Sequence, residues 1–313
     1  MEMKSTRESF GETLVELGRK NENIVVLSGD LEDSTRAEYF KKEFPARFFN
    51  LGIAEQDLLG TAVGLSMEGF IPFVCSFGVF LTNRAYDVLR ISVCYNNRNV
   101  KLIGSHTGLT VGPDGATAQC LEDIAITRVL PNLTVLCPAD AIETKKATRA
   151  MAGINGPVYL RLGRPPVPLI TKESDPFRIG KANLMREGND VTIIACGLMV
   201  SESLKAARIL EKEGVQARVI NMHTIKPIDQ EMIVKSAQET GVIVTAEEHQ
   251  ACGGLGSAVA EVVTQNYPVP MEMVAVHDTF GESGEPEELL KKYHLKDMDI
   301  VEAAQRVIRR KNR

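Results

Sequence analysis

Residues 54–76, AEQDLLGTAVGLSMEGFIPFVCS, contain the helix–strand unit that decides the fold. Residues 54–67 have the length and apolar character of a buried helix, and IPFVCS (71–76) is a short apolar run typical of a buried strand. Short strand-like runs and helix-length segments alternate in the same way along the whole chain. This alternation predicts an α/β protein with two domains, each with a mainly parallel sheet flanked by helices.

The other elements follow from the same pattern. We expect further helices at 5–20, opened by a Ser5–Glu8 capping box, and at 81–95, 121–129, 140–152, 199–212 and 254–266, with two more near the C-terminus. The expected strands lie at 24–29, 100–105, 134–137, 158–162, 191–197, 216–221, 241–248 and 271–276. The proline-rich stretch 163–176 interrupts the series and predicts a domain at 1–166, a linker at 167–179 and a second domain at 180–313.

The composition excludes several classes of function. The net charge is −5 and the Lys and Arg residues are scattered, which argues against nucleic acid or an anionic membrane as the main partner. No stretch reaches the roughly 18 apolar residues of a membrane span. Six widely spaced cysteines without a C-x-x-C motif are typical of reduced thiols in a cytoplasmic protein. None of the five histidines is paired at ligand spacing, so we expect no metal site within this chain.

Glu55 stands at the start of the apolar helix quoted above. A carboxylate in this place is commonly explained by the free N–H groups and the dipole of the helix N-terminus. The Gly-Ile-Ala lead-in and the apolar helix behind Glu55 instead indicate a carboxylate removed from water. Such a group can hold or hand over a proton near neutral pH, so Glu55 is a candidate catalytic residue.

Residues that suit an anion collect where the expected strands end. The Gly-rich loop 106–119 follows the strand 100–105, and ligands of open α/β sheets bind at this carboxyl edge. A loop of this length is uncommon unless it is functional. His106 and Asp114 lie in this loop. Each polar side chain alone is more simply a solvated group, but the guanidinium groups and the hydroxyl that together suit a phosphate are those of Arg7, Ser34, Arg161 and Arg164. Phe77 and Phe80 are core residues unless a flat aromatic ring stacks on them.

Several runs of the sequence resemble transketolases. The runs similar to the pyrimidine-binding domain, which 1-deoxyxylulose-5-phosphate synthases share, are LGIAEQDLLGTAVGLSMEGFIPFVCSF (51–77), FLTNRAYD (80–87), SHTGLTVGPDGATAQCLEDIA (105–125) and LRLGRPPVP (160–168). The runs similar to the transketolase C-terminal domain lie at 190–229, 244–261 (VTAEEHQACGGLGSAVAE) and 278–284 (DTFGESG). They occur in family order and cover essentially the whole chain.

The resemblance implies thiamine diphosphate chemistry with half of the machinery. In transketolases a separate N-terminal domain holds the diphosphate and its Mg²⁺ or Ca²⁺ through a GDG…N motif, which this sequence lacks. The chain therefore looks like the C-terminal subunit of a split transketolase, with an N-terminal subunit as its partner in an α2β2 assembly and with self-association through both domains. Such an enzyme passes a two-carbon ketol unit from a ketose to an aldose, and its substrates are sugar phosphates.

The resemblance also assigns roles to residues. Glu55 matches the carboxylate that hydrogen-bonds the aminopyrimidine ring of the cofactor and promotes loss of the proton from its reacting carbon. Phe77 and Phe80 match aromatic residues around that ring, and Asp30 matches an aspartate near the cofactor. The sugar-phosphate-binding positions are matched by Arg7, Ser34, His106 and Arg164. Asp114 matches the aspartate that reads the donor's C2 hydroxyl configuration, and Arg161 aligns with an arginine of the deoxyxylulose synthases.

Two positions depart from the family pattern. Ala118 stands where a T-H-Q motif usually has a histidine that contacts substrate oxygens. Asn83 stands where a tyrosine is often found near the cofactor. These changes bear on donor preference and on the stacking around the cofactor.

Three other hypotheses fit parts of the sequence. The β subunit of a 2-oxo-acid dehydrogenase has a similar length, domain order and cofactor role, but the intact set of sugar-phosphate-binding positions favours a phosphosugar. A split 1-deoxyxylulose-5-phosphate synthase is less favoured, because that family is normally one chain. The third hypothesis is a non-catalytic binding module that regulates a partner. In that case replacing Glu55 would not change the activity measured with the partner present.

Overall fold

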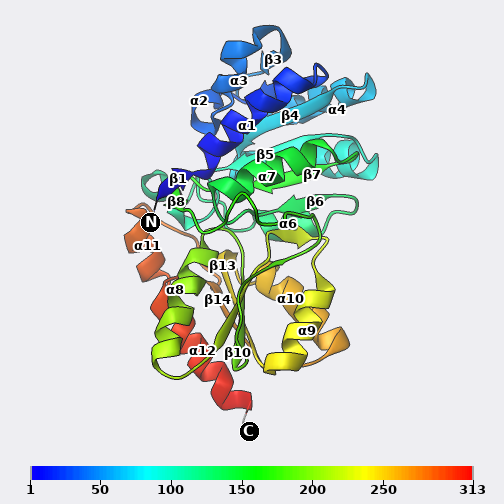
Figure 1. The fold of residues 1–313 in the computed structure, drawn as a ribbon. Helices are drawn as coiled ribbons and strands as arrows, with labels where there is room; N and C mark the ends of the chain where they lie inside the picture. The colour runs from blue at the N-terminus through cyan, green and yellow to red at the C-terminus, as the bar shows by residue number, and fades with distance from the viewer. Residues whose placement is uncertain (1, 312–313) are drawn as a thin grey trace.

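Parallel strands joined by helices build both halves of the molecule (Figure 1), and the computed structural model describes residues 2–311. The N-terminal sheet has the order β12-β6-β7-β5-β4-β2-β3. Its strands are β2 (Ile24–Ser28), β3 (Phe48–Asn50), β4 (Ile71–Phe77), β5 (Lys101–Ser105), β6 (Thr134–Leu136), β7 (Val158–Arg161) and β12 (Thr224–Lys226). Every neighbouring pair is parallel except β12 with β6, which is antiparallel. The predicted fold class is confirmed.

Helices cover both faces of this sheet. Its helical segments are α1 (Thr6–Lys20), α2 (Glu32–Thr35), α3 (Glu38–Glu43), η1 (Pro45–Arg47), α4 (Glu55–Met67), η2 (Phe80–Arg84), α5 (Tyr86–Val88), η3 (Leu89–Tyr95), η4 (Leu109–Asp114), α6 (Asp123–Arg128) and α7 (Ala141–Ala152). On one face, Phe10 of α1, Phe40 of α3 and Met151 of α7 pack in one buried cluster with Phe73 and Ile103 of the sheet. On the other face α4, η3 and α6 pack against β4 and β5.

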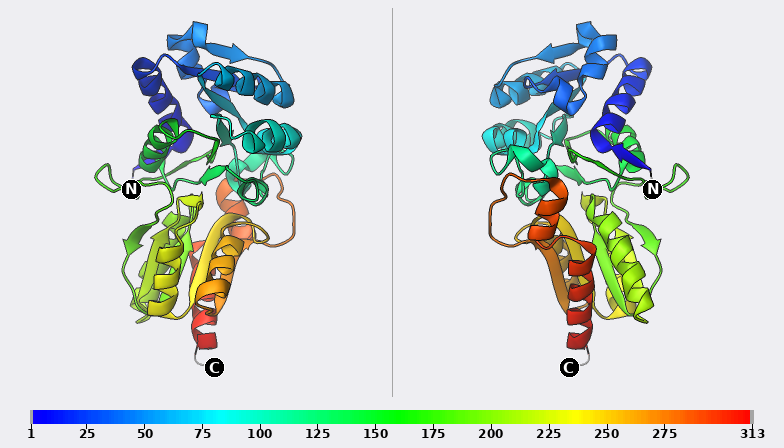
Figure 2. Two further views of the ribbon diagram at one scale, coloured as in Figure 1. Left: turned by 90° about the vertical axis from the view of Figure 1, so that its right-hand side faces the viewer. Right: turned by 90° about the vertical axis from the view of Figure 1, so that its left-hand side faces the viewer.

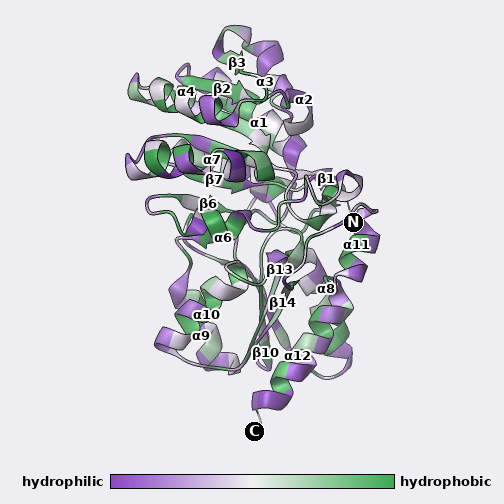
Figure 3. Ribbon diagram, turned by 180° about the vertical axis from the view of Figure 1, so that it is seen from behind, coloured by the Kyte–Doolittle hydropathy of each residue, from purple (hydrophilic) through white to green (hydrophobic). Residues whose placement is uncertain are grey.

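The C-terminal sheet has the order β14-β13-β10-β11-β9, with only β9 antiparallel among its described strands. Its elements are β9 (Asn183–Arg186), β10 (Val191–Ala195), α8 (Met199–Lys212), β11 (Ala217–Asn221), α9 (Gln230–Thr240), β13 (Ile243–Gln250), α10 (Leu255–Asn266), β14 (Met271–Val276), α11 (Pro286–Lys292) and α12 (Asp297–Lys311). The helices α8 and α12 share one buried cluster, and α12 shows polar and apolar turns side by side in Figure 3. The helices α9 and α10 belong to a different cluster, which also contains residues of the N-terminal domain.

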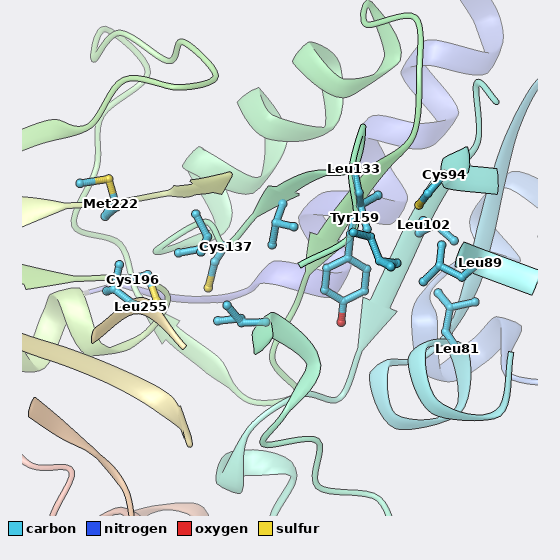
Figure 4. Packing of buried hydrophobic residues seen from close by; sticks show 14 of the residues in the cluster. Leu81, Leu89, Cys94, Leu102, Leu133, Cys137, Tyr159, Cys196, Met222 and Leu255 are labelled. Carbon is cyan, nitrogen blue, oxygen red and sulfur yellow. The ribbon is translucent and has the colours of Figure 1, made fainter. Parts of the chain in front are cut away.

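One apolar core runs through both domains. It contains Leu81 and Leu89 of the N-terminal domain together with Met222 and Leu255 of the C-terminal domain, as Figure 4 shows. The strand β12 crosses the same boundary to complete the edge of the N-terminal sheet. The two domains therefore pack through a continuous buried interface.

The structure corrects several details of the sequence prediction. The helix α1 begins at Thr6, but the Ser5 side chain makes no capping hydrogen bond, so the predicted capping box is wrong. The expected helix 81–95 is two π-helical segments, η2 and η3, joined by α5. Within the expected linker, β8 (Pro166–Pro168) pairs with β1 (Met3–Ser5), and Thr171 donates two hydrogen bonds to Asp140. The segment is therefore fastened to the N-terminal domain along part of its length.

Candidate functional site

The predicted site residues follow the carboxyl ends of neighbouring parallel strands. The register of β2, β4, β5 and β7 brings their C-terminal ends to one edge of the sheet. Asp30 follows β2, Phe77 ends β4, His106 follows β5 and Arg164 follows β7. This is the edge at which open α/β sheets bind ligands.

Glu55 is the first residue of α4, and only 4% of it is exposed. Its carboxylate oxygens lie 3.3 and 3.5 Å from one guanidinium nitrogen of Arg84, whose side chain is 51% exposed. Both residues line an open hollow of about 540 Å³ with Ile53, Gln56 and Asp57. The carboxylate is thus withdrawn from bulk water, keeps one counter-charge, and faces a space that a ligand can enter.

Arg84 begins a stack of flat groups that leads away from Glu55. Its guanidinium lies 4.2 Å from the ring centroid of Phe80. The rings of Phe80 and Phe77 are 5.7 Å apart at 17°, and Phe77 and His106 are 3.9 Å apart at 22°. Sequence reasoning did not single out Arg84, although it lies in the run FLTNRAYD. The stack places Phe77 and Phe80 between the carboxylate and the anion-binding residues.

His106 is a neutral imidazole at neutral pH. Burial and three nearby guanidinium groups lower its pKa to about 3; in order of effect these are Arg7, Arg164 and Arg36. Its Nδ1 lies 3.0 Å from the Ser105 hydroxyl, and its φ of +54° is unusual for a residue with a side chain. The sequence did not reveal Arg36 as the third arginine, because nothing in the motif marks it.

Arg7, Ser34, Arg164 and Asp114 lie together, as predicted. The Arg7 guanidinium donates to the backbone oxygens of Ser34 and Arg164, the latter at 2.9 and 3.2 Å. The Arg164 guanidinium donates to Asp114 Oδ1 at 3.1 Å and to the Val111 carbonyl. Burial, followed by the charges of Arg36 and Arg164, lowers the pKa of Arg7. Positive charge is therefore concentrated here, as an anion-binding site requires.

Arg161 does not join this cluster. It is buried, and its Nε lies 2.9 and 3.1 Å from the carboxylate oxygens of Asp123. The same guanidinium donates to the backbone oxygens of Cys120 and of Glu248, which belongs to the C-terminal domain. Its contacts therefore tie the two domains together.

Asp30 is exposed and supports the loop that precedes Glu55. Its Oδ1 accepts from the Asn50 amide at 3.2 Å, and the Asn50 side-chain oxygen accepts from the backbone N–H groups of Asp30 and Gly52. Of the two departures from the family pattern, Ala118 is buried and Asn83 donates to Glu122 at 3.0 Å.

Comparison with known proteins identifies the family. The family "Transketolase, pyrimidine binding domain" matches residues 2–168, and "Transketolase, C-terminal domain" matches residues 180–300. The chain belongs to the transketolase family. The resemblance on which the residue assignments rest is thereby confirmed, and the stretch between the two matches falls within the expected linker.

Some relatives in this family are similar to the chain over nearly their full length. A protein described as a transketolase C-terminal section from Methanocaldococcus jannaschii is 46% identical, covering 95% of this chain and 94% of the relative. The 6-deoxy-6-sulfo-D-fructose transketolase subunit SqwH from a Clostridium species is 42% identical, covering 98% and 95%. A solved structure described as a split gene transketolase, inactive beta4 tetramer, is 50% identical with a TM-score of 0.92, covering 97% and 98%.

Two features are absent from residues 2–311. No helix in this part of the transketolase-family chain is long and apolar enough to cross a membrane. No three His, Cys, Asp or Glu side chains within it gather closely enough to hold a metal ion.

Proposed function

We propose that this chain is the C-terminal subunit of a thiamine diphosphate-dependent transketolase and transfers a two-carbon ketol unit from a ketose to an aldose. The observation that carries the proposal is Glu55: a buried carboxylate at the open end of α4, beside a hollow and a stack of aromatic rings. Three relatives whose names or titles include transketolase align along nearly the whole chain, two of them named as a section or a subunit and one as a split gene product.

The residues present fit the aminopyrimidine half of the cofactor. Glu55 offers a carboxylate acceptor, and Phe80 offers a flat apolar face when the half-exposed Arg84 guanidinium moves off it, with Phe77 packed behind. When bound, thiamine diphosphate supplies a nucleophilic carbon that takes up the ketol unit and passes it on. In this proposal Glu55 accepts a hydrogen bond from the pyrimidine ring and controls the proton at that position, while Asp30 and Asn50 hold the loop before it.

The arginine cluster is proposed to bind the anionic end of the sugar. One positive region is surrounded by Arg7, Ser34, His106 and Arg164. Arg164 holds Asp114 there, where its carboxylate can accept a hydrogen bond from a substrate hydroxyl. Neutral His106 can donate one hydrogen bond and accept another there, without adding charge. A sugar phosphate suits this site, and the sulfonate named for one relative would use the same donors. Arg161 is left out of the proposed binding site because its guanidinium is buried between the domains, where it bonds to Asp123 and to two backbone carbonyls.

We assign the diphosphate and its Mg²⁺ or Ca²⁺ to an N-terminal partner subunit in a cytoplasmic α2β2 enzyme. Two features of the solvent-facing side of α4 and the residues before it support the proposal of a docked partner. At Gly60 and Gly64 a Cβ would meet no described atom within 4 Å beyond its chain neighbours and the backbone of its own helix, which leaves room for close approach of another backbone. Ile53, beside the hollow, is 74% exposed. A second copy of this chain is the other expected contact.

The test is to purify the chain together with its partner and to assay ketol transfer across phosphorylated ketoses and aldoses. We expect transfer that requires both subunits, thiamine diphosphate and a divalent ion, and no tight cofactor binding by this chain alone. Release of CO₂ from a 2-oxo acid with a lipoyl acceptor, in place of ketol transfer, would instead identify the β subunit of a 2-oxo-acid dehydrogenase.

A further inference from the structure

We propose that the C-terminal domain holds the substrate loop, residues 106–119, in its working conformation, and that Gln119 is the positioning residue of this contact. The segment of the C-terminal domain that makes the contact is residues 278–285, DTFGESGE, which we call the clasp. Figure 2 shows the orange segment after β14 rising beside the N-terminal domain. The role assigned to the loop rests on the proposed function, because the loop carries His106 and Asp114.

Gln119 joins the two ends of the loop to the clasp. It is 4% exposed, and its side-chain amide donates to the Leu109 carbonyl at 3.1 Å and to the Glu282 carbonyl at 2.8 Å. Leu109 lies near the start of the loop and Glu282 lies in the clasp. One buried amide thus closes the loop on itself and fastens it to the other domain, and losing such a buried bond costs about 1–3 kcal/mol.

Glycines permit the close approach of clasp and loop. A Cβ on Gly281 would stand 2.0 Å from Gln119 Oε1, and a Cβ on Gly115 would stand 2.5 Å from the Ser283 hydroxyl. Gly112, with a φ of +79°, would place a Cβ 3.3 Å from the Gly284 carbonyl oxygen. The glycines therefore leave the space that the Gln119 amide and the Ser283 hydroxyl fill between the two segments, and a side chain at any of the three positions would crowd this contact.

The C-terminal domain also fastens the first part of the loop. Glu248 of β13 is buried and accepts a hydrogen bond from the backbone N–H of Thr110. A Cβ on Gly108 would stand 2.3 Å from the Glu248 carboxyl carbon. The clasp itself is braced, because Gln250 donates to the Thr279 carbonyl at 2.7 Å and accepts from the Asp278 N–H at 3.1 Å. The loop is therefore held at two places by a rigid support.

This support fixes Asp114 against Arg164. Asp114 lies between the two fastened parts of the loop, and its carboxylate meets the Arg164 guanidinium at 3.1 Å. Residues 106–119 contain only the short segment η4, and the further backbone bonds within the loop join neighbouring turns at 112–119, so its place relative to Arg164 depends on contacts outside the loop. When the clasp contact is broken, we expect Asp114 to lose its fixed place and the affinity for the sugar to fall.

The test uses two variants and a matched control in the full-length chain. Gln119→Ala removes the amide, and Gly281→Ala pushes a methyl group against it. Gly153→Ala is the control, because its Cβ would meet only the Ala150 carbonyl oxygen, at 3.5 Å, at the end of α7. Hydrogen exchange is measured peptide by peptide on the isolated chain. Donor KM and kcat are then measured in the complex with the partner.

Both variants are expected to raise amide exchange in 106–119 by about tenfold or more, with the strands unchanged, and to raise donor KM about tenfold with a smaller change in kcat. In the double variant the methyl group at position 281 no longer clashes with the Gln119 amide, because Gln119→Ala has removed it. The effects of the two substitutions on exchange and KM should therefore be less than additive. Exchange in 106–119 equal to that of Gly153→Ala, or raised no more than in the strands, would overturn the proposal. A wild-type complex without ketol transfer would refute the proposed function, while the exchange result still decides the clasp.

Discussion

Two buried carboxylates in this chain are each paired with an arginine, and the pairs differ in what surrounds them. Asp123 is fully buried and also accepts a hydrogen bond from the Tyr159 hydroxyl. Its partner Arg161 is 6% exposed and also donates to two backbone carbonyls. Glu55 is nearly as buried, but its partner Arg84 is half exposed and both line an open hollow. A closed, fully bonded pair supports the fold, whereas a buried acid with a replaceable partner beside open space suits a ligand.

The largest expected effect breaks the closed pair. Arg161→Met should lower the free energy of unfolding by about 3–5 kcal/mol, because it leaves the Asp123 carboxylate buried without its counter-charge. Urea titration measures this loss. A change below about 1 kcal/mol would show that the interdomain pair is not structural and would remove the contrast with Glu55.

The next effect concerns the anion cluster. Arg164→Gln should raise the KM for a phosphorylated donor about 10- to 100-fold, because a charge-assisted hydrogen bond is worth about 1.5–3 kcal/mol. The control is Arg149→Gln, since Arg149 pairs with Glu16 at the surface on α7. Steady-state kinetics of the complex measure the KM of both variants. Equal KM values would place the anion elsewhere.

The interdomain boundary should also respond to pH. Burial raises the pKa of Glu143 and of Glu248 to about 7 in the folded chain. The unfolded chain releases these protons near pH 4.5, so the folded state binds more protons between pH 4.5 and 7, and stability falls as pH rises through that window. Glu248→Gln should flatten this slope by on the order of 1 kcal/mol per pH unit. Melting temperatures across the window measure it, and an unchanged slope would contradict the assignment.

The smallest effect completes the comparison. Arg84→Met should change the free energy of unfolding by no more than about 1 kcal/mol, because Arg84 is half exposed and water can replace it at the hollow. The same urea titration used for Arg161→Met gives this value. A loss as large as that of Arg161→Met would make the Glu55 pair structural too.

Much of the fold could be predicted from the sequence, because buried parallel strands are short apolar runs and the helices between them are long. The shared edge followed from that pattern, and so did the place of His106 and Arg164 at it, whereas the addition of Arg7 to His106 came from the resemblance to transketolases. The three-residue strand β12 could not be foreseen, since its place depends on the edge of the other domain's sheet. Arg161 and Arg164 look alike in the sequence, and only the packing of the C-terminal domain separates the buried one from the anion cluster.

Other parts of the site were invisible for similar reasons. Arg84 reaches Glu55 only because η2 turns back over α4, and Arg36 matters only through its distance from Arg7 and His106. Gln119 was part of a motif, yet its bond to Glu282 joins residues far apart in the chain. Most of the chemical groups of the site could be predicted from the sequence, but which of them are in contact depends on tertiary packing.

The account depends most on Glu55, and ketol transfer by the complex carrying Glu55→Ala tests it most directly. The control is Glu68→Ala, an exposed carboxylate at the other end of the same helix. Gel filtration confirms that both complexes assemble. The account predicts a rate at least about 100-fold below wild type for Glu55→Ala and a wild-type rate for Glu68→Ala. A Glu55→Ala complex that assembles and transfers ketol units within twofold of the wild-type rate would contradict it.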